Sequence, residues 1–300
     1  MKQDYPNIGI GTLCRLFGKT RHAYYDKGWR VQDQGLKEDI VIQKVLEIRK
    51  EIPGIGTLKL HSMLTPVFRS HQIKIGRDYM FDLLREHGLQ IRRRRRKAIT
   101  TNSRHWMHKY ANLIKDLIPS RPEQIWVSDI TYIRFSGQWG YLSLVTDAYS
   151  KQIMGFCFRK DLSGQGCIEA LKMALGNRMY PEGELIHHSD RGSQYCSKAY
   201  VDVLLEGKVA ISMTENGDPY ENAIAERVNG ILKTDFNLYN SADGFKETKK
   251  RIARNIKAYN TIRPHLSVDL LTPEQAHLKT GVLRKLWKTK SYNKDEKVLV

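Results

Sequence analysis

The sequence lacks the cysteine pattern of a disulfide-stapled or zinc-binding protein. Its 300 residues include four cysteines, and no two of them form a CxxC pair. Disulfide frameworks and structural zinc sites both need regularly spaced cysteines, so neither organises this chain. His105 and His108 have a ligand-like spacing, but no cysteine pair follows them, and we interpret them as polar surface residues.

Long apolar runs and a secretory leader are also missing. No apolar stretch is long enough to cross a bilayer, and the N-terminal sequence MKQDYPNIG has no apolar core. No amphipathic helix or lipidation motif lies beside the basic segment described next. We therefore expect a cytoplasmic protein that has no membrane partner.

Acidic residues are scarce relative to basic ones, most of all in the first part of the chain. Fifty Lys and Arg stand against 32 Asp and Glu, a net charge of +18, and residues 1–120 carry 24 basic against 11 acidic side chains. Blocks of like charge usually form solvated linkers, but a flexible basic linker can also follow a phosphate backbone. The excess favours a polyanion partner, with nucleic acid ahead of a membrane surface. It peaks in one unbroken run: Arg92, Arg93, Arg94, Arg95, Arg96 and Lys97.

The first 90 residues predict small helical units. A helix near Leu13, a glycine at 18, a cap at Thr20 and a second helix through Tyr24 have the outline of a helix-turn-helix, in which Arg21 is a candidate DNA contact. Further helices are expected over residues 37–50, 56–64 and 76–88, and they could form another three-helix unit. Many helical hairpins bind nothing, so the charge excess is what favours DNA binding here.

The second half has the pattern of an α/β domain. β-branched and aromatic residues predict strands over 124–135, 139–150, 151–160, 183–188 and 209–214. Helical patterns over 165–177 and 197–208 separate the later strands, and long helices are expected over 221–238 and 245–259. This order predicts a mixed five-stranded sheet with flanking helices.

Two carboxylates belong to this predicted sheet. Asp129 interrupts an apolar strand. Burying a carboxylate there costs free energy unless a metal ion or a basic side chain compensates its charge. The alternative is that Asp129 faces solvent on an edge strand. Asp190 directly follows another strand, where it could instead cap the helix expected near Ser197. If the two strands are neighbours, both carboxylates converge. A third carboxylate, Glu226, lies on a polar face of a predicted helix, which consists of Asn222, Glu226, Asn229 and Lys233. An ordinary solvent-exposed helix face would have a similar composition.

Three blocks that contain these residues carry a family resemblance. WVSDITYI, HHSDRGSQY and NGDPYENAIAERVNGILK resemble the catalytic blocks of DDE transposases, in particular the second-reading-frame transposases of the IS-three family, relatives of retroviral integrases. Thirty-five residues separate Asp190 from Glu226, Lys233 follows seven positions later, and YNTIRPHLSVDLLTPEQAH is similar to the family's later stretch. The resemblance covers roughly residues 40–280. Glu221 and Arg227 depart from the usual residues, but neither belongs to the acidic triad.

The resemblance implies an architecture. A helical, helix-turn-helix-like DNA-binding region is expected at 1–90 and a basic linker at 91–119. A ribonuclease-H-like catalytic core is expected at 120–240, with a C-terminal helical extension at 241–300.

It also implies a chemistry and a set of partners. Asp129, Asp190 and Glu226 would hold two Mg²⁺ or Mn²⁺ ions, about 3.5–4 Å apart, that stabilise both ends of a phosphodiester displacement. The implied partners are double-stranded DNA (terminal repeats and target), a second copy of the chain on DNA and possibly a first-reading-frame protein, with nucleoid association while DNA is bound. Beside the basic run and Arg21, the candidate DNA contacts are Asn222, Lys233 and His188.

Two other functions fit the same residues. A nuclease of this fold would cut DNA without joining it, and a regulator derived from a transposase would bind DNA without cutting it. The basic helical front and the C-terminal stretch favour the transposase over the nuclease, and the intact triad argues against the regulator.

Overall fold

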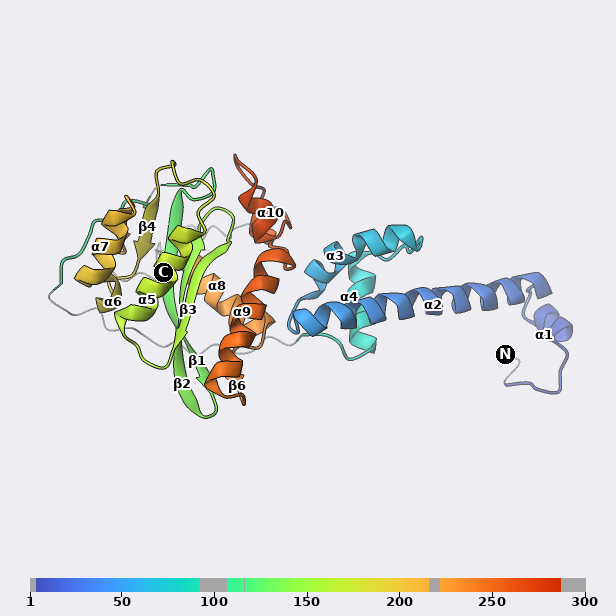
Figure 1. Ribbon diagram of the computed structural model, residues 1–300. Coiled ribbons are helices and arrows are strands. Elements are labelled where there is room, and N and C mark those ends of the chain that lie inside the picture. Colours follow the sequence, from blue (N-terminus) through green and yellow to red (C-terminus); the bar gives the residue numbers. More distant parts are fainter. Residues whose placement is uncertain (1–3, 92–106, 116, 216–221, 287–300) are drawn as a thin grey trace, which may run out of the picture. The chain divides into compact units, whose positions relative to one another are not determined.

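The computed structural model describes residues 4–91, 107–115, 117–215 and 222–286 (Figure 1). The chain divides into a front unit, residues 1–50 and 56–90, and a core unit, residues 51–55 and 91–300. The run from Arg92 to Lys97 lies outside the described residues, as does His105. Within the described ranges, no helix is both long and apolar enough to cross a membrane.

The front unit consists of four helices: α1 (Ile10–Leu16), α2 (Arg21–Glu51), α3 (Thr57–Ser70) and α4 (Arg77–Glu86). Gly18 adopts a φ of +63° between α1 and α2, a conformation that glycine reaches without a side-chain clash. The Thr20 hydroxyl accepts a hydrogen bond from the Ala23 amide (3.1 Å), as an N-cap does. The buried residues of the second half of α2, together with those of α3 and α4, form the apolar interior of this unit: Val41, Ile42, Val45, Leu60, Leu64, Phe68, Met80, Leu83 and Leu84.

Two helices of the front unit are longer than the sequence pattern predicts. The helix that begins at Arg21 and the helix expected over 37–50 are one continuous helix, because no proline occurs between Arg21 and Glu51 and the helix continues through Gly28 and Gly35. The helix expected over 56–64 continues through Pro66 to Ser70. The prediction of separate short helices in this region was therefore wrong.

The core unit is built on a mixed sheet, as predicted. Its strands are β1 (Ile125–Phe135), β2 (Gln138–Asp147), β3 (Ile153–Arg159), β4 (Ile186–Ser189) and β5 (Ala210–Met213), in the order β3-β2-β1-β4-β5. β2 is antiparallel to both β1 and β3, whereas β1, β4 and β5 run parallel. A two-residue strand, β6 (Asn240–Ser241), pairs with the far end of β1 and was not predicted. The order and directions are those of the expected ribonuclease-H-like fold.

Helices cover both faces of this sheet. Trp126 packs with residues of α5 (Gly164–Gly176), α6 (Ser193–Cys196) and α7 (Lys198–Glu206) on one face. The neighbouring residues Ile125 and Val127 pack with Ala225 of α8 (Ala223–Asp235) on the other face. Successive side chains of a strand point to opposite faces, so α8 lies across the sheet from α5 and α7.

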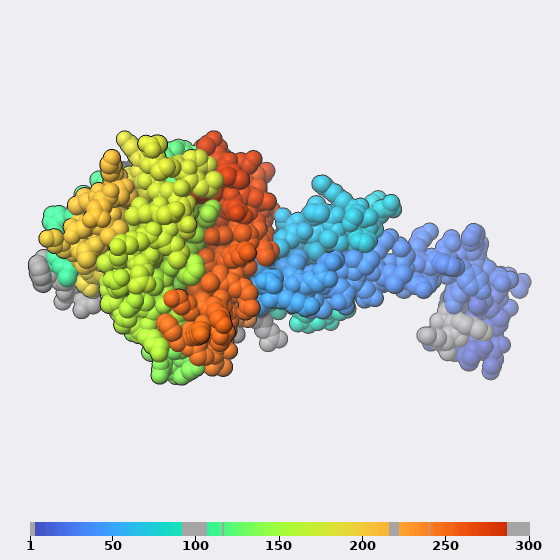
Figure 2. Space-filling view, in the orientation of Figure 1, coloured from blue at the N-terminus to red at the C-terminus, as the bar shows by residue number. Residues whose placement is uncertain are grey.

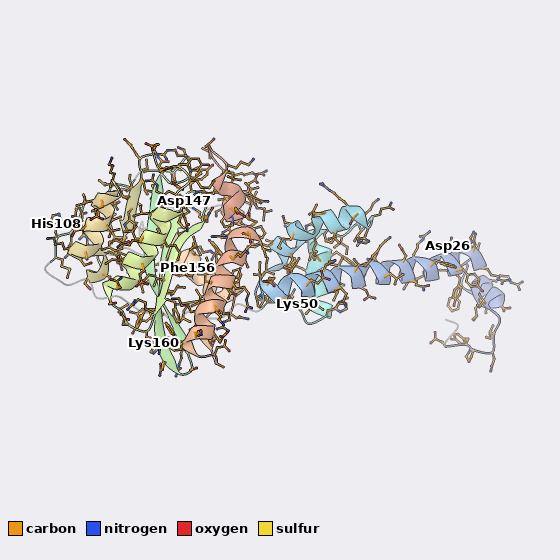
Figure 3. The ribbon with its side chains drawn as sticks, in the orientation of Figure 1. Asp26, Lys50, His108, Asp147, Phe156 and Lys160 are labelled. Carbon is orange, nitrogen blue, oxygen red and sulfur yellow. The ribbon has the colours of Figure 1, made fainter. Side chains whose placement is uncertain are left out.

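The remaining helices follow β3 and α8. α9 (Phe245–Thr261) packs on β3 and on α8, and a short 3-10 helix (Leu266–Val268) leads to α10 (Pro273–His277), beside α9 in Figure 1. His277 is 1% exposed, with its Nε2 3.3 Å from Glu123 Oε1 and its Nδ1 2.9 Å from Ser150 Oγ. Asp147, labelled in Figure 3, accepts the Glu123 amide hydrogen (2.7 Å), so this buried polar cluster fixes α10 at the start of β1 and the end of β2.

One glycine sets how closely α5 can approach the sheet. A Cβ atom on Gly155 in β3 would collide with the carbonyl oxygen of Ala170 and lie 2.7 Å from the Ala174 nitrogen, both in the α5 backbone. We expect Gly155→Ala to destabilise the core unit by about 3 kcal/mol, the upper part of the range for overpacking, because backbone atoms cannot rotate away. Urea denaturation measures the change. Gly176→Ala is the matched control, since no atom lies within 4 Å of its added Cβ, and an equal loss in both variants would contradict the prediction.

Candidate active site

Two carboxylates meet where two parallel strands lie side by side. Val127 of β1 pairs with His188 of β4 in the parallel ladder. Two residues beyond that pair are Asp129, inside β1, and Asp190, immediately after β4. Because side chains repeat their direction every two residues, Asp129 and Asp190 lie in neighbouring positions on one side of the sheet. The convergence expected if the strands were neighbours is therefore present.

Helix α8 places a third carboxylate at the same position. Asn222, its N-cap, donates from Nδ2 to the Ser128 carbonyl oxygen (3.0 Å), and Asn229 donates from Nδ2 to Asp129 Oδ2 (2.7 Å). Glu226 lies one turn after the first asparagine and nearly one turn before the second, so it shares their face of the helix. Both asparagines are buried, whereas Glu226 is exposed at the edge of the site. The apolar residues Ala225, Val228, Ile231 and Leu232 are buried, and this fixes the rotation of α8.

The electrostatics of the site follow from this convergence. Burial, and then the negative charges of Asp190 and Glu226, raise the pKa of Asp129 to about 7, against the lowering effect of hydrogen bonds from the Ile130 amide and Asn229. A carboxyl group that titrates near neutral pH lacks a sufficient counter-charge. The site is therefore short of positive charge.

The loop after β4 holds Asp190 in place. Its Oδ1 accepts the Gly192 amide hydrogen (2.9 Å), which closes a tight Asx-type turn, and a Cβ on Gly192 would lie only 2.9 Å from that oxygen. The alternative that Asp190 caps the helix near Ser197 is wrong, because α6 intervenes and Ser197 itself is the N-cap residue of α7.

Two expected DNA contacts have buried side chains instead. His188 is fully buried, with its Nδ1 2.9 Å from Ser212 Oγ of β5. Asn222 is 7% exposed and ties α8 to β1. The structure therefore does not support direct DNA contacts by His188 and Asn222, because burial in the sheet and under the helix keeps both away from solvent.

The neighbouring histidine also has a structural role. His187 is buried, with its Nε2 2.7 Å from Ser128 Oγ and 2.9 Å from the Tyr200 hydroxyl. Burial, and then the neighbouring His188, lower the pKa of His187 to about 3, so it is neutral at physiological pH. It links β1, β4 and α7 on the face opposite α8.

The remaining predicted contacts differ in how closely they approach the site. Lys233 is partly buried, and burial lowers its pKa while the negative charge of Asp129 raises it, which places the ammonium group near the site. Arg21 is exposed at the start of α2, in the front unit. Arg92 to Arg96 and Lys97 lie outside the described residues.

The donor set suits a hard divalent cation. Asp129, Asp190 and Glu226 offer only carboxylate oxygens, the ligands that Mg²⁺ and Mn²⁺ prefer. Among the residues that the structure describes, no three His, Cys, Asp or Glu side chains already form a group able to hold a metal ion. The repulsion that raises the pKa of Asp129 opposes such a closed group, and a cation would relieve it. The three carboxylates therefore have the ligand chemistry that the cation needs, although they do not yet form a complete coordination site.

Asn229 is the neighbour of the carboxylates to which the sequence analysis assigned no role, although it placed the residue on the polar face of the helix. Its amide donates to Asp129 without adding charge, so it fixes one carboxylate oxygen without neutralising the group. Its position three residues after Glu226 on a polar helix face was visible in the sequence. The bond to β1 was not visible, because it depends on how α8 crosses the strand.

The chain is similar to integrase core domains and to proteins of bacterial insertion sequences. One integrase core domain family model matches residues 119–219, and a second matches residues 207–273. A 31 kDa protein of insertion element IS600 from Shigella sonnei is 32% identical over 271 residues, which cover 87% of this chain and 96% of that protein. The transposase for insertion sequence element IS629, also from Shigella sonnei, is 30% identical over 236 residues and covers 75% of this chain and 76% of that protein.

Two further proteins match a shorter part of the chain. Transposase InsF for insertion sequence IS3A of Escherichia coli is 34% identical over 153 residues, which cover 51% of this chain and 53% of that protein. The HTLV-2 integrase catalytic core domain, solved in complex with magnesium, superposes with a TM-score of 0.43 at 18% identity, covering 53% of this chain and 99% of that chain.

The raised pKa of Asp129 predicts a pH-dependent stability of the metal-free protein. In the unfolded chain Asp129 ionises from its ordinary value of 3.8, whereas in the folded protein it keeps its proton up to about 7. Between those values the folded state binds more protons, so stability falls as the pH rises, by roughly 4 kcal/mol at most. Asp129→Asn removes this loss. We expect its gain in melting temperature over the wild type, measured in EDTA, to grow from pH 4 to pH 7 and then level off.

A charge-matched variant controls for the loss of any carboxylate. Asp202→Asn removes an exposed charge on α7, so it is expected to show no such growing gain. A gain for Asp129→Asn that is the same at pH 4.5 and pH 8 would contradict the assignment of this titration to Asp129.

Proposed function

Because the chain belongs to the insertion-sequence transposases of the IS-three family, with an integrase-like core, we propose that it cleaves element ends and joins them to target DNA. The first step is hydrolysis of a phosphodiester at the element end, with water as the nucleophile. The second is attack of the freed 3′-hydroxyl on a target phosphodiester. Neither step requires a covalent bond to the protein.

The observation that carries the proposal is the meeting of three carboxylates on one face of the sheet. Asp129 and Asp190 occupy neighbouring positions at adjacent parallel strands, and α8 brings Glu226 to them. Burial of Asp129 and the like charges of Asp190 and Glu226 raise the pKa of Asp129 to about 7, and a bound cation would relieve both effects. Carboxylates that converge on neighbouring strands and an adjoining helix are the arrangement that a metal-dependent phosphoryl-transfer site needs.

Asp129, Asp190 and Glu226 would hold two Mg²⁺ or Mn²⁺ ions between them. The ions supply charge stabilisation for the attacking and the leaving oxygen and lower the pKa of the attacking water. The protein's own contribution is positional. Asn229 holds one oxygen of Asp129, the Gly192 amide holds one oxygen of Asp190, and the Lys233 ammonium group contacts DNA near the scissile phosphate.

The other parts of the chain bind DNA and partners. Residues 1–90, with Arg21 at the start of α2, recognise DNA, and the basic run from Arg92 to Lys97 follows the phosphate backbone. Both element ends must be joined in one event, so two copies of the chain act together, with a first-reading-frame protein as a further partner. The DNA substrate places the working protein in the bacterial cytoplasm, associated with the nucleoid.

The triad is tested by variants that remove charge but little volume. We expect Asp129→Asn, Asp190→Asn and Glu226→Gln each to reduce Mg²⁺-dependent cleavage of terminal-repeat DNA by more than a thousandfold, with folding and DNA binding retained. The same variants should lose the rise in melting temperature that Mg²⁺ gives the wild type. Asp202→Asn is the control, with wild-type cleavage.

The products separate the candidate functions. Joined strands support the transposase, cut strands alone indicate the nuclease, and bound DNA alone indicates the regulator. Substantial Mg²⁺-dependent cleavage by any one of the three triad variants would overturn the assignment of that residue.

The basic run is tested by the salt dependence of DNA affinity. If four arginines among Arg92 to Arg96 contact phosphates, their replacement by glutamine should flatten the slope of log affinity against log salt by about 0.9 per contact. The affinity for all duplex sequences should fall alike, because phosphate contacts position without reading bases. Arg21→Gln should instead change the preference among sequences. An unchanged slope would mean that the run is a solvated linker.

A further inference from the structure

We propose that the outer face of α9 is a second, sequence-independent duplex-DNA surface, which holds target DNA on the core unit. This inference rests on the proposed transposase function and adds a surface that the acidic triad and the front unit do not include. We call it the α9 ridge and define it as Lys246, Lys250, Arg254 and Lys257.

The part of the chain around the triad has no excess of basic residues. Residues 121–240, which contain the whole triad, carry 12 Lys and Arg against 15 Asp and Glu, a net charge of −3. The 17 residues of α9 carry six basic side chains and one acidic side chain. Within residues 121–261 the excess of positive charge therefore lies in this helix, where it can attract polyanionic DNA.

The spacing of the ridge places its charges in one line. Its members follow one another at intervals of four, four and three residues, which puts them on a single face of the helix. At 1.5 Å per residue the line is roughly 16 Å long. Duplex DNA carries one negative charge per about 1.7 Å of its axis, so a line of this length can contact several phosphates.

The packing of α9 fixes which face points outward. Ile252, Ile256 and Tyr259 are buried on the inner face. The Asn260 side chain accepts from the Ile153 amide (3.0 Å) and donates to the Ile153 carbonyl oxygen (2.9 Å), so it pairs with β3 as a neighbouring strand would. The whole ridge is exposed, and α9 lies on the surface of the core unit in Figure 2 (orange).

Neighbouring acidic groups leave most of the ridge uncompensated. Glu247 lies 2.9 Å from Lys250, both exposed, and Asp243 pairs with Arg251, which lies beside the ridge and is only partly exposed. Lys249 lies on the flank toward Glu169, where its positive charge helps to lower the pKa of that carboxyl group. For Lys246, Arg254 and Lys257 no ion pair occurs among the residues that the structure describes.

An ordinary solvated helix face would carry a different pattern. The exposed face of α7 mixes Lys198 with Asp202 and Glu206, as surface helices usually do. Like charges four residues apart destabilise a helix, and the ridge contains two such pairs, Lys246 with Lys250 and Lys250 with Arg254. A binding partner of opposite charge would offset this repulsion.

The chemistry of the ridge favours phosphates over bases. Three of its four members are lysines, whose ammonium groups act as point charges on long flexible stems. The ridge has no Asn or Gln, the side chains that form paired hydrogen bonds with adenine. The exposed residue next to Arg254 is Ala253, whose side chain has no hydrogen-bonding group. Such a surface holds duplex DNA of any sequence, which is the chemistry that target DNA offers.

The test compares two sets of four charge removals in the full chain. The ridge variant is Lys246→Gln, Lys250→Gln, Arg254→Gln and Lys257→Gln. The control variant is Lys172→Gln, Lys198→Gln, Lys208→Gln and Lys279→Gln, which removes four exposed lysines elsewhere on the core unit. The probes are a terminal-repeat duplex and a scrambled duplex of the same length.

We expect the ridge variant to flatten the slope of log affinity against log salt by about 3 on both duplexes, since each lost phosphate contact accounts for roughly 0.9. The control variant should change it by less than 1. The conservative variant with Lys246→Arg, Lys250→Arg and Lys257→Arg should keep the wild-type slope, because charge and not residue identity matters. Melting temperatures verify that all variants are folded.

Two outcomes would overturn the proposal. Equal slopes in ridge and control variants would mean that α9 does not contact DNA, and a loss confined to the terminal-repeat duplex would mean that it reads element ends. With pre-cleaved ends, joining to an unrelated plasmid at 150 mM salt should fall at least tenfold in the ridge variant and be restored at 50 mM salt. A wild type that neither cuts nor joins would reject the proposed function, whereas the slopes decide on α9 independently of catalysis.

Discussion

The convergence of two further carboxylates on the desolvated Asp129 is the constraint on which the rest of the core unit depends. Burial and the negative charges of Asp190 and Glu226 raise the pKa of Asp129 to about 7, so the folded chain keeps these groups together at a free-energy cost. That cost must be met by interactions elsewhere in the fold. A cluster of carboxylates that lowers the stability of the fold when it is empty, and whose repulsion a bound cation relieves, is suited to metal-dependent chemistry.

The interactions that meet this cost surround strand β1. The bonds from Asn222 and Asn229 hold α8 against its middle, and the buried pair of His277 and Glu123 anchors α10 at its start. On the opposite face, Trp126 is buried among residues of α5, α6 and α7. Apart from the bond between Asn229 and Asp129, these contacts do not involve the carboxylates, so most of the scaffold is held independently of the charge at the site.

The sequence predicted the parts of this arrangement that depend on local pattern. β-branched and aromatic residues located the five main strands, and the positions of Asp129, Asp190 and Glu226 in or beside predicted elements singled out the three carboxylates. It failed where tertiary contacts decide. The burial of His188 depends on its contact with β5, and the bond of Asn229 depends on how α8 crosses β1. The length of α2 depends on the helix continuing through two glycines, which the local pattern does not predict. The charge of α9 was hidden for a simpler reason: a count over residues 121–300 averages a cationic helix with an anionic core.

The choice of asparagine beside Asp129 follows from the same constraint. A lysine or arginine in the place of Asn229 would pair with the carboxylate, lower its pKa and compete with any cation for its oxygens. An amide satisfies one oxygen and leaves the charge available. Two groups of positive charge in the core unit lie beside this carboxylate rather than on it: Lys233 is partly buried at the margin of the site, and the α9 ridge lies on the outer surface of the next helix. This separation lets the unit attract a polyanion without losing the negative site that acts on it.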